Sequence, residues 1–198
     1  MKENRELREL ARSQLRGSWL TAVGMVLVYY IILGISGSVV VGPIILGGPL
    51  TLGYWSYFSR KARKQEAEIE NLFDGFKIFG KSFLLYLLIN VFTALWSFLL
   101  IIPGIIKSFS YSMAFFILRD NPEIETLEAI TRSRKMMDGY KWKLFLLYLS
   151  FIGWSILCCL TFGIGFLWLC PYISLSVANF YEDIKQNQQE VPDTANIY

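Results

Sequence analysis

The chain has 198 residues, of which 54% are hydrophobic and only 18% charged, with a net charge of +3 and a mean hydropathy of +0.42. The charges are segregated: Gly17 to Ser59 carries none over 43 residues, and Leu144 to Tyr181 carries none over 38. A soluble domain needs charged side chains on every solvated face. Uncharged runs of this length therefore exclude a water-soluble fold and predict helices in lipid.

The residue types also limit the chemistry. The chain has no histidine, which excludes imidazole acid–base catalysis and imidazole metal ligation. Cys158, Cys159 and Cys170 lie inside an apolar run without CxxC spacing, so we expect them to pack as small hydrophobic side chains. Since the sequence contains no P-loop, nucleophile motif or dinucleotide fingerprint, we predict that the protein is not an enzyme and has neither a cofactor nor a metal site.

Residues 3–16 predict an amphipathic helix at the membrane surface. Their apolar side chains recur at helical spacing, and the arginines form a separate stripe of Arg5, Arg8, Arg12 and Arg16. Arginines on such a helix contact anionic headgroups, at about 1 kcal/mol each. The alternative is a solvated helix with intrahelical Glu–Arg pairs. Trp19, where the chain would enter the membrane, favours the surface helix.

Three apolar hairpins are predicted at about 20–59, 82–118 and 144–181. About 20 apolar residues span a bilayer core as a helix, so each hairpin is long enough for two crossings. Each run is interrupted near its middle by residues that break helices, at Gly42-Pro43 with Gly47-Gly48-Pro49, at Pro103-Gly104 and at Gly163-Ile164-Gly165. The limb 104–118 gives only about 22 Å of helix against a core of about 30 Å, so a full crossing stays open.

Charged amphipathic segments lie between the hairpins. One is expected near 72–80, with an apolar face of Leu72, Phe73, Phe76 and Phe79. The other is expected from Asn121, as the N-cap, to Gly139, with acidic residues in its first half and basic residues in its second. Residues 182–198 are predicted to form a polar, disordered cytoplasmic tail.

The predicted fold is all-α and integral to the membrane. It is a single transmembrane domain over residues 1–181, with six transmembrane helices as three hairpins, each preceded by an amphipathic interfacial helix. Lys and Arg concentrate before and between the hairpins, so the positive-inside rule places those segments and both termini in the cytoplasm. The tryptophans fit two belts, with Trp19, Trp55 and Trp142 inside and Trp96, Trp154 and Trp168 outside.

A three-fold internal repeat is possible. One shift along the chain pairs Gly17 with Gly139, Pro49 with Pro171 and Arg12 with Arg134. The middle hairpin shares shorter matching sequence segments with the last hairpin. Since every unit would start in the cytoplasm, the repeats would be parallel, with their axis along the membrane normal.

Few residues could carry a specific contact. Lys107 is the one charge within the hairpins, and it either snorkels to the outer headgroups or contacts a substrate or lipid phosphate. Asn90, Ser97 and Asn179 either hydrogen-bond between helices or line a polar path. The candidates for contacts with anionic headgroups are the four arginines of residues 3–16 together with Arg132, Arg134 and Lys135.

Several motifs are shared with a known family: Ala11-Arg12, Leu95-Trp96-Ser97, Ile102 to Lys107, Tyr111-Ser112-Met113, Asp120-Asn121-Pro122, Ser133 to Met137 with Gly139, Lys141-Trp142-Lys143, and Leu160 to Trp168. On these residues the chain resembles the bacterial membrane proteins of domain of unknown function 975, over nearly its whole length. The resemblance implies a multi-pass protein of the bacterial inner membrane. It assigns no reaction and no catalytic residue.

The sequence therefore predicts a non-enzymatic membrane protein with a membrane-organising, lipid-contacting or accessory role. The alternative is a small permease or transporter subunit with a cavity between the repeats. The expected partner is the lipid bilayer, through anionic headgroups on its cytoplasmic face, with a membrane-protein partner or a second copy of the chain as further possibilities. The basic residues are explained by the membrane, so no nucleic-acid binding is predicted.

Overall fold

The structure is a computed structural model, which describes residues 1–37, 42–99 and 101–190. Within these ranges the chain is helical and contains no strand. The helices are α1 (Asn4–Leu15), α2 (Trp19–Ser36), α3 (Gly42–Ala62), the 3-10 helix η1 (Ile69–Ile78), α4 (Phe79–Leu99), α5 (Ile101–Tyr111), α6 (Ala114–Asp120), α7 (Thr126–Met136), α8 (Lys141–Leu149), α9 (Ile152–Leu160) and α10 (Phe166–Glu190).

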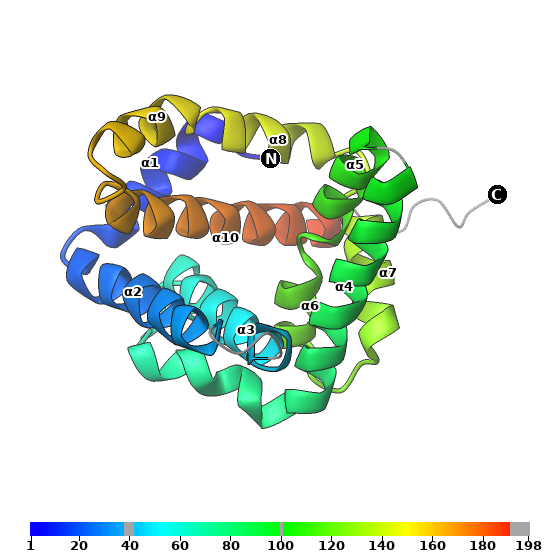
Figure 1. The fold of residues 1–198 in the computed structure, drawn as a ribbon. Coiled ribbons are helices and arrows are strands. Elements are labelled where there is room, and N and C mark those ends of the chain that lie inside the picture. Colours follow the sequence, from blue (N-terminus) through cyan, green and yellow to red (C-terminus); the bar gives the residue numbers. More distant parts are fainter. Residues whose placement is uncertain (38–41, 100, 191–198) are drawn as a thin grey trace.

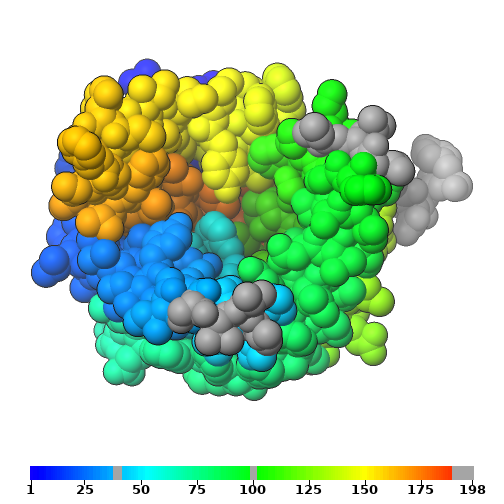
Figure 2. Space-filling view, in the orientation of Figure 1, coloured from blue at the N-terminus to red at the C-terminus, as the bar shows by residue number. Residues whose placement is uncertain are grey.

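The apolar helices form three antiparallel pairs, each made of an outer and an inner limb. In the first pair, the Tyr29 hydroxyl of α2 lies 3.2 Å from the Thr51 hydroxyl of α3. In the second pair, α5 and α6 return along α4, and in the third, α10 returns along α8 and α9. Figure 1 shows α2, α4 and α8–α9 arranged around α3, α6 and α10, and Figure 2 shows the surfaces of these outer limbs in the same orientation. The limbs therefore lie side by side in pairs, although the middle inner limb is broken between α5 and α6.

Each charged amphipathic helix packs on an inner limb. α1 packs on α10, η1 on α3 and α7 on α6. Leu7, Ala11 and Leu15, which form the apolar face of α1, are fully buried against the protein. The prediction that this face lies on the membrane surface is therefore wrong, because α10 covers it. The Glu–Arg pairing of the alternative is present, since Arg5 lies 2.9 Å from Glu9.

Each pair packs against the start of the next pair. One contact from each pair shows this: Gly48 of α3 with Phe83 of α4, Phe109 of α5 with Phe145 of α8, and Thr161, at the closed end where α9 joins α10, with Trp19 across a pocket. The pairs therefore follow one another around a ring.

Three helical stretches among the described residues are long and apolar enough to cross a membrane. They are Trp19–Ser36, Ile69–Phe98 and Lys141–Leu160, which contain the outer limbs. Large apolar side chains on these limbs and at their ends are exposed, including Leu20 at 86% and Phe98 at 94%. Apolar surface of this extent fits contact with lipid.

Two boundaries differ from the predictions. α10 continues to Glu190, so residues 182–190 are helical and are not a disordered tail; residues 191–198 lie outside the described ranges. α7 begins at Thr126 with Glu125 as its N-cap, so Asn121 does not cap it. Gly139 follows the helix with a φ of +76°, a left-handed conformation that glycine adopts readily.

Candidate functional site

An ionic cluster joins the ends of the three inner limbs. Asp120, the last residue of α6, accepts hydrogen bonds from Arg63 at 2.6 Å, Lys185 of α10 at 2.6 Å and the Tyr181 hydroxyl at 3.0 Å. Arg63 also donates to Glu182 of α10 at 2.7 Å. The Asp120 side chain is only 7% exposed. A buried carboxylate with several charged donors is held firmly, because each charge is compensated.

The electrostatics of Asp120 follow from these partners. Burial alone would raise the pKa of Asp120, but the hydrogen bonds and positive charges of Arg63 and Lys185 outweigh it, so the pKa of Asp120 lies below its ordinary value. Arg119 donates to the Ser59 hydroxyl and to Asp120. Burial, followed by the charge of Arg63, lowers the pKa of Arg119. The cluster therefore holds its carboxylate ionised and stabilises the meeting point of α3, α6 and α10.

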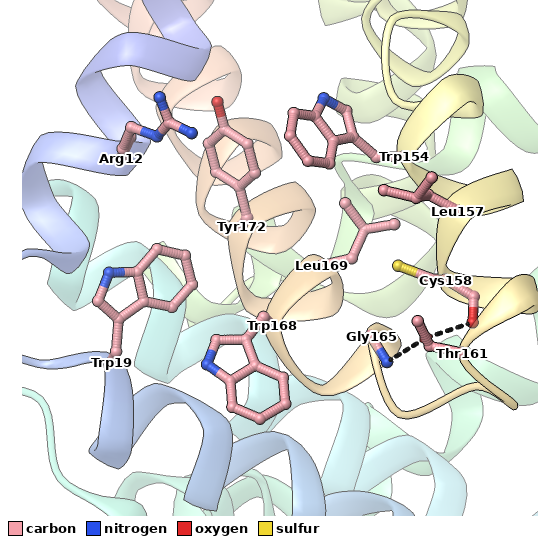
Figure 3. Close-up of a pocket in the computed structure, with 10 residues that line it drawn as sticks. All are labelled: Arg12, Trp19, Trp154, Leu157, Cys158, Thr161, Gly165, Trp168, Leu169 and Tyr172. Atoms are coloured by element: carbon pink, nitrogen blue, oxygen red, sulfur yellow. Dashed lines mark hydrogen bonds between the residues drawn. The ribbon is translucent and has the colours of Figure 1, made fainter.

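A second site, the tryptophan pocket, opens between α1, α2, α9 and α10 (Figure 3). It has a volume of about 310 Å³. Aromatic rings from three helices and aliphatic side chains surround it, and the Arg12 guanidinium lies at one end beside Tyr172. Its lining residues are Arg12, Trp19, Trp154, Leu157, Cys158, Thr161, Gly165, Trp168, Leu169 and Tyr172.

The tryptophan pocket joins residues that the sequence assigns to opposite faces. Trp19 was expected in the cytoplasmic belt, and Trp154 and Trp168 in the outer one. The three side chains instead line one space, because the chain leaves α1 beside the closed end of the third pair. These tryptophans therefore do not mark two separate belts.

The arginines of α1 have different surroundings. Arg8 donates to the carbonyl oxygen of Ser150 at 3.3 Å and lies over the Phe151 ring, while Arg5 is paired with Glu9. Arg16 is exposed. Arg12 has no ion pair or hydrogen bond within the described ranges, so its charge is free for a ligand at the tryptophan pocket.

Lys107 does not stand alone. Together with Arg134, Lys135 and Lys141 it lines a cavity of about 320 Å³ between α5, α7 and α8, which we call the cation cavity. The Lys107 ammonium group lies 4.7 Å from the centre of the Trp96 ring. The structure thus brings together residues that the sequence placed on opposite sides of the membrane.

The other candidate residues make local or packing contacts. Arg132 pairs with Glu128 at 2.6 Å, on the exposed side of α7. The Asn90 amide donates to the Tyr86 carbonyl of its own helix at 2.8 Å, and Ser97 lies where α4 and α5 approach at Gly104. The amide of Asn179 donates to the Gln14 side chain at 2.8 Å, which joins α10 to α1 as the packing interpretation expects.

Sequence reasoning missed the ionic cluster. Its members are Ser59, Arg63, Arg119, Asp120, Tyr181, Glu182 and Lys185. A usable signal was present, because charged residues follow directly after each of the three inner limbs. Within the described ranges, no group of His, Cys, Asp and Glu side chains is placed to hold a metal ion.

The comparisons with known proteins give one match. A family model described as "Protein of unknown function (DUF975)" matches residues 1–107 and 98–188. No curated protein and no solved structure matches the chain.

Proposed function

The chain belongs to the family of proteins of unknown function DUF975, and from its geometry we propose that it is a non-enzymatic membrane protein that binds anionic phospholipid. The tryptophan pocket carries this proposal. An apolar space between helices on a lipid-facing surface accepts an acyl chain, and an unpaired arginine at its end attracts a headgroup phosphate. Its volume of about 310 Å³ lies at the lower end of the range for small-ligand sites.

We further propose that the protein lies in the bacterial inner membrane with six embedded limbs and with both termini in the cytoplasm. The bare outer limbs support contact with lipid. The N-terminus lies beside the C-terminal half of α10, since the Lys2 amide donates to the Asp183 carboxylate at 3.0 Å, which supports one side for both ends of the chain. The concentration of Lys and Arg near α1 and α7 supports assigning that side to the cytoplasm.

The three-fold repeat also belongs to this proposal. Gly17 and Gly139, which the repeat pairs, both have positive φ, at +81° and +76°, and each follows an amphipathic helix. Each amphipathic helix covers an inner limb, and α1 closes the ring by packing on α10, the last helix. Equivalent packing at three places is what a parallel repeat would produce.

Quenching of tryptophan fluorescence tests the lipid proposal, because three tryptophans line the pocket. In vesicles of phosphatidylcholine doped with chain-brominated phosphatidylglycerol, we expect stronger quenching than with the brominated phosphatidylcholine. Arg12→Gln should weaken the preference for the anionic lipid by about fivefold, the equivalent of about 1 kcal/mol for one arginine at a headgroup.

Arg16→Gln is the matched control, because Arg16 is exposed on the same segment and does not line the pocket. It should leave the preference unchanged. Equal quenching by both lipids in the natural protein, or equal effects of the two substitutions, would contradict the proposal. The alternative function, a small permease, would instead require a solute flux that depends on this protein in reconstituted vesicles.

A further inference from the structure

The cation cavity has more positive charge than its protein partners compensate. It is lined by Lys107 of α5, Arg134 and Lys135 of α7 and Lys141 at the start of α8, with Asp138 as the only carboxylate among its lining residues. Asp138 lies 3.7 Å from Lys141, and its side chain is 85% exposed. Within the described part of the chain, Lys107, Arg134 and Lys135 have no ion pair. Holding like charges around one cavity is unfavourable without an anion.

The polar groups of the cavity suit an oxyanion. The hydroxyl groups of Ser110 and Thr131 stand among the cations as further lining groups. Arg134 offers the fork of N–H donors that matches phosphate oxygens, and the lysines add point charges. The cavity therefore has the charge and the donors of a phosphate site.

The surroundings of the cavity identify the source of that phosphate. On α5, Ile102, Ile105 and Ile106 are between 47% and 73% exposed, so bare apolar surface borders the cations. We propose that the cation cavity binds the phosphate of an anionic phospholipid, whose chains lie along these isoleucines. This inference rests on the proposed lipid function and names a second headgroup site, separate from the tryptophan pocket.

The position of the cavity also identifies the leaflet. Arg134, Lys135 and Lys141 belong to the Lys- and Arg-rich segment 119–143, which the positive-inside rule places in the cytoplasm. Because Lys107 lines the same cavity, it faces the inner leaflet and not the outer headgroups. The packing of α5 on α8 accounts for this, since the ring centres of Phe109 and Phe145 lie 6.1 Å apart.

Native mass spectrometry of the full chain in mild detergent tests the inference, with short-chain phosphatidylglycerol and phosphatidylcholine as probes. In the double variant Lys107→Ala/Arg134→Ala, the phosphatidylglycerol of the cation cavity should bind about 25-fold more weakly, since each cation contributes about fivefold, while the one of the tryptophan pocket stays bound. Arg132→Gln is the control, because Arg132 lies on the same helix but is paired with Glu128. Lys107→Arg should retain binding, which separates lost charge from lost folding.

Each outcome is decisive. Loss of one bound phosphatidylglycerol in the double variant but not in Arg132→Gln, at unchanged thermal stability, supports the site. Unchanged phosphatidylglycerol binding in the double variant, with weaker binding in Arg12→Gln, overturns the cation cavity as a lipid site and supports the tryptophan pocket. Unchanged binding in both variants overturns the lipid function itself. Displacement of phosphatidylglycerol by an excess of inorganic phosphate would overturn the assignment to lipid.

Discussion

Asp120→Asn is expected to lower the free energy of unfolding by about 3–5 kcal/mol, the usual cost of removing one partner from a buried ion pair. The variant removes the carboxylate that Arg63, Lys185 and Arg119 share. The Asp120 side chain is only 7% exposed, so water cannot replace it as their partner. Since these cations come from three different limbs, their repulsion would separate the limbs. Denaturant unfolding of the detergent-solubilised protein, followed by tryptophan fluorescence, measures the change.

Asp138→Asn is the matched control. Its carboxylate is 85% exposed and has one distant partner, Lys141 at 3.7 Å, so the substitution should change the free energy of unfolding by no more than about 0.5 kcal/mol. Equal losses in the two variants would mean that the ionic cluster does not hold the inner limbs together.

The same cluster predicts a dependence on pH. Because the folded pKa of Asp120 lies below its ordinary value, its stabilisation is complete above the unfolded pKa of about 3.9 and is lost as the pH falls through the folded pKa. The difference in melting temperature between the natural protein and Asp120→Asn should therefore stay constant from pH 7 to about pH 4 and shrink as the pH falls further. A difference that also stays constant below about pH 4 would show that Asp120 does not act through its charge.

Gly53→Ala should destabilise the protein by at least about 2 kcal/mol, within the range for overpacking a tight contact. Gly53 of α3 lies directly against the backbone of η1: an added Cβ would overlap the carbonyl group of Leu72 and lie 2.8 Å from its Cα. Backbone cannot move aside as a flexible side chain can, so α3 and η1 would separate. Thermal unfolding in detergent measures the loss.

Gly34→Ala separates this effect from helix propensity. Gly34 lies inside α2 with no neighbouring atom within 4 Å of an added Cβ. Alanine is favoured over glycine in helices by up to about 1 kcal/mol, so this variant should be as stable as the natural protein or more so. If Gly53→Ala were equally harmless, the close packing of η1 on α3 would not be a feature of the folded protein.

The sequence predicted the features that depend on local pattern. The apolar runs predicted the outer limbs, with α2 beginning at Trp19 near the expected residue 20, and Gly139 adopts a left-handed conformation shortly after α7 ends at Met136. Hydropathy and helix-ending residues act over a few turns, so they can be recognised without knowing the neighbours.

The features that sequence reasoning missed depend on contacts between distant segments. The amphipathic pattern of α1 identifies an apolar face, but it cannot distinguish lipid from α10 as the surface that covers Leu7. The pairing of Asp120 with Lys185 joins residues 65 positions apart, and Lys107 and Arg134 line one cavity only because α5 and α7 pack together. Neither arrangement leaves a periodic signal in the chain.

The side of the membrane that residue 107 faces is the most direct test of this account. Lys107→Cys can be placed in a chain whose Cys158, Cys159 and Cys170 are changed to serine, with Asp138→Cys as the reference for the cytoplasmic side. A membrane-impermeant maleimide should modify both positions in inverted vesicles and neither in intact spheroplasts. Labelling of residue 107 from outside the spheroplasts would contradict the arrangement of the helical pairs and the headgroup site built on it.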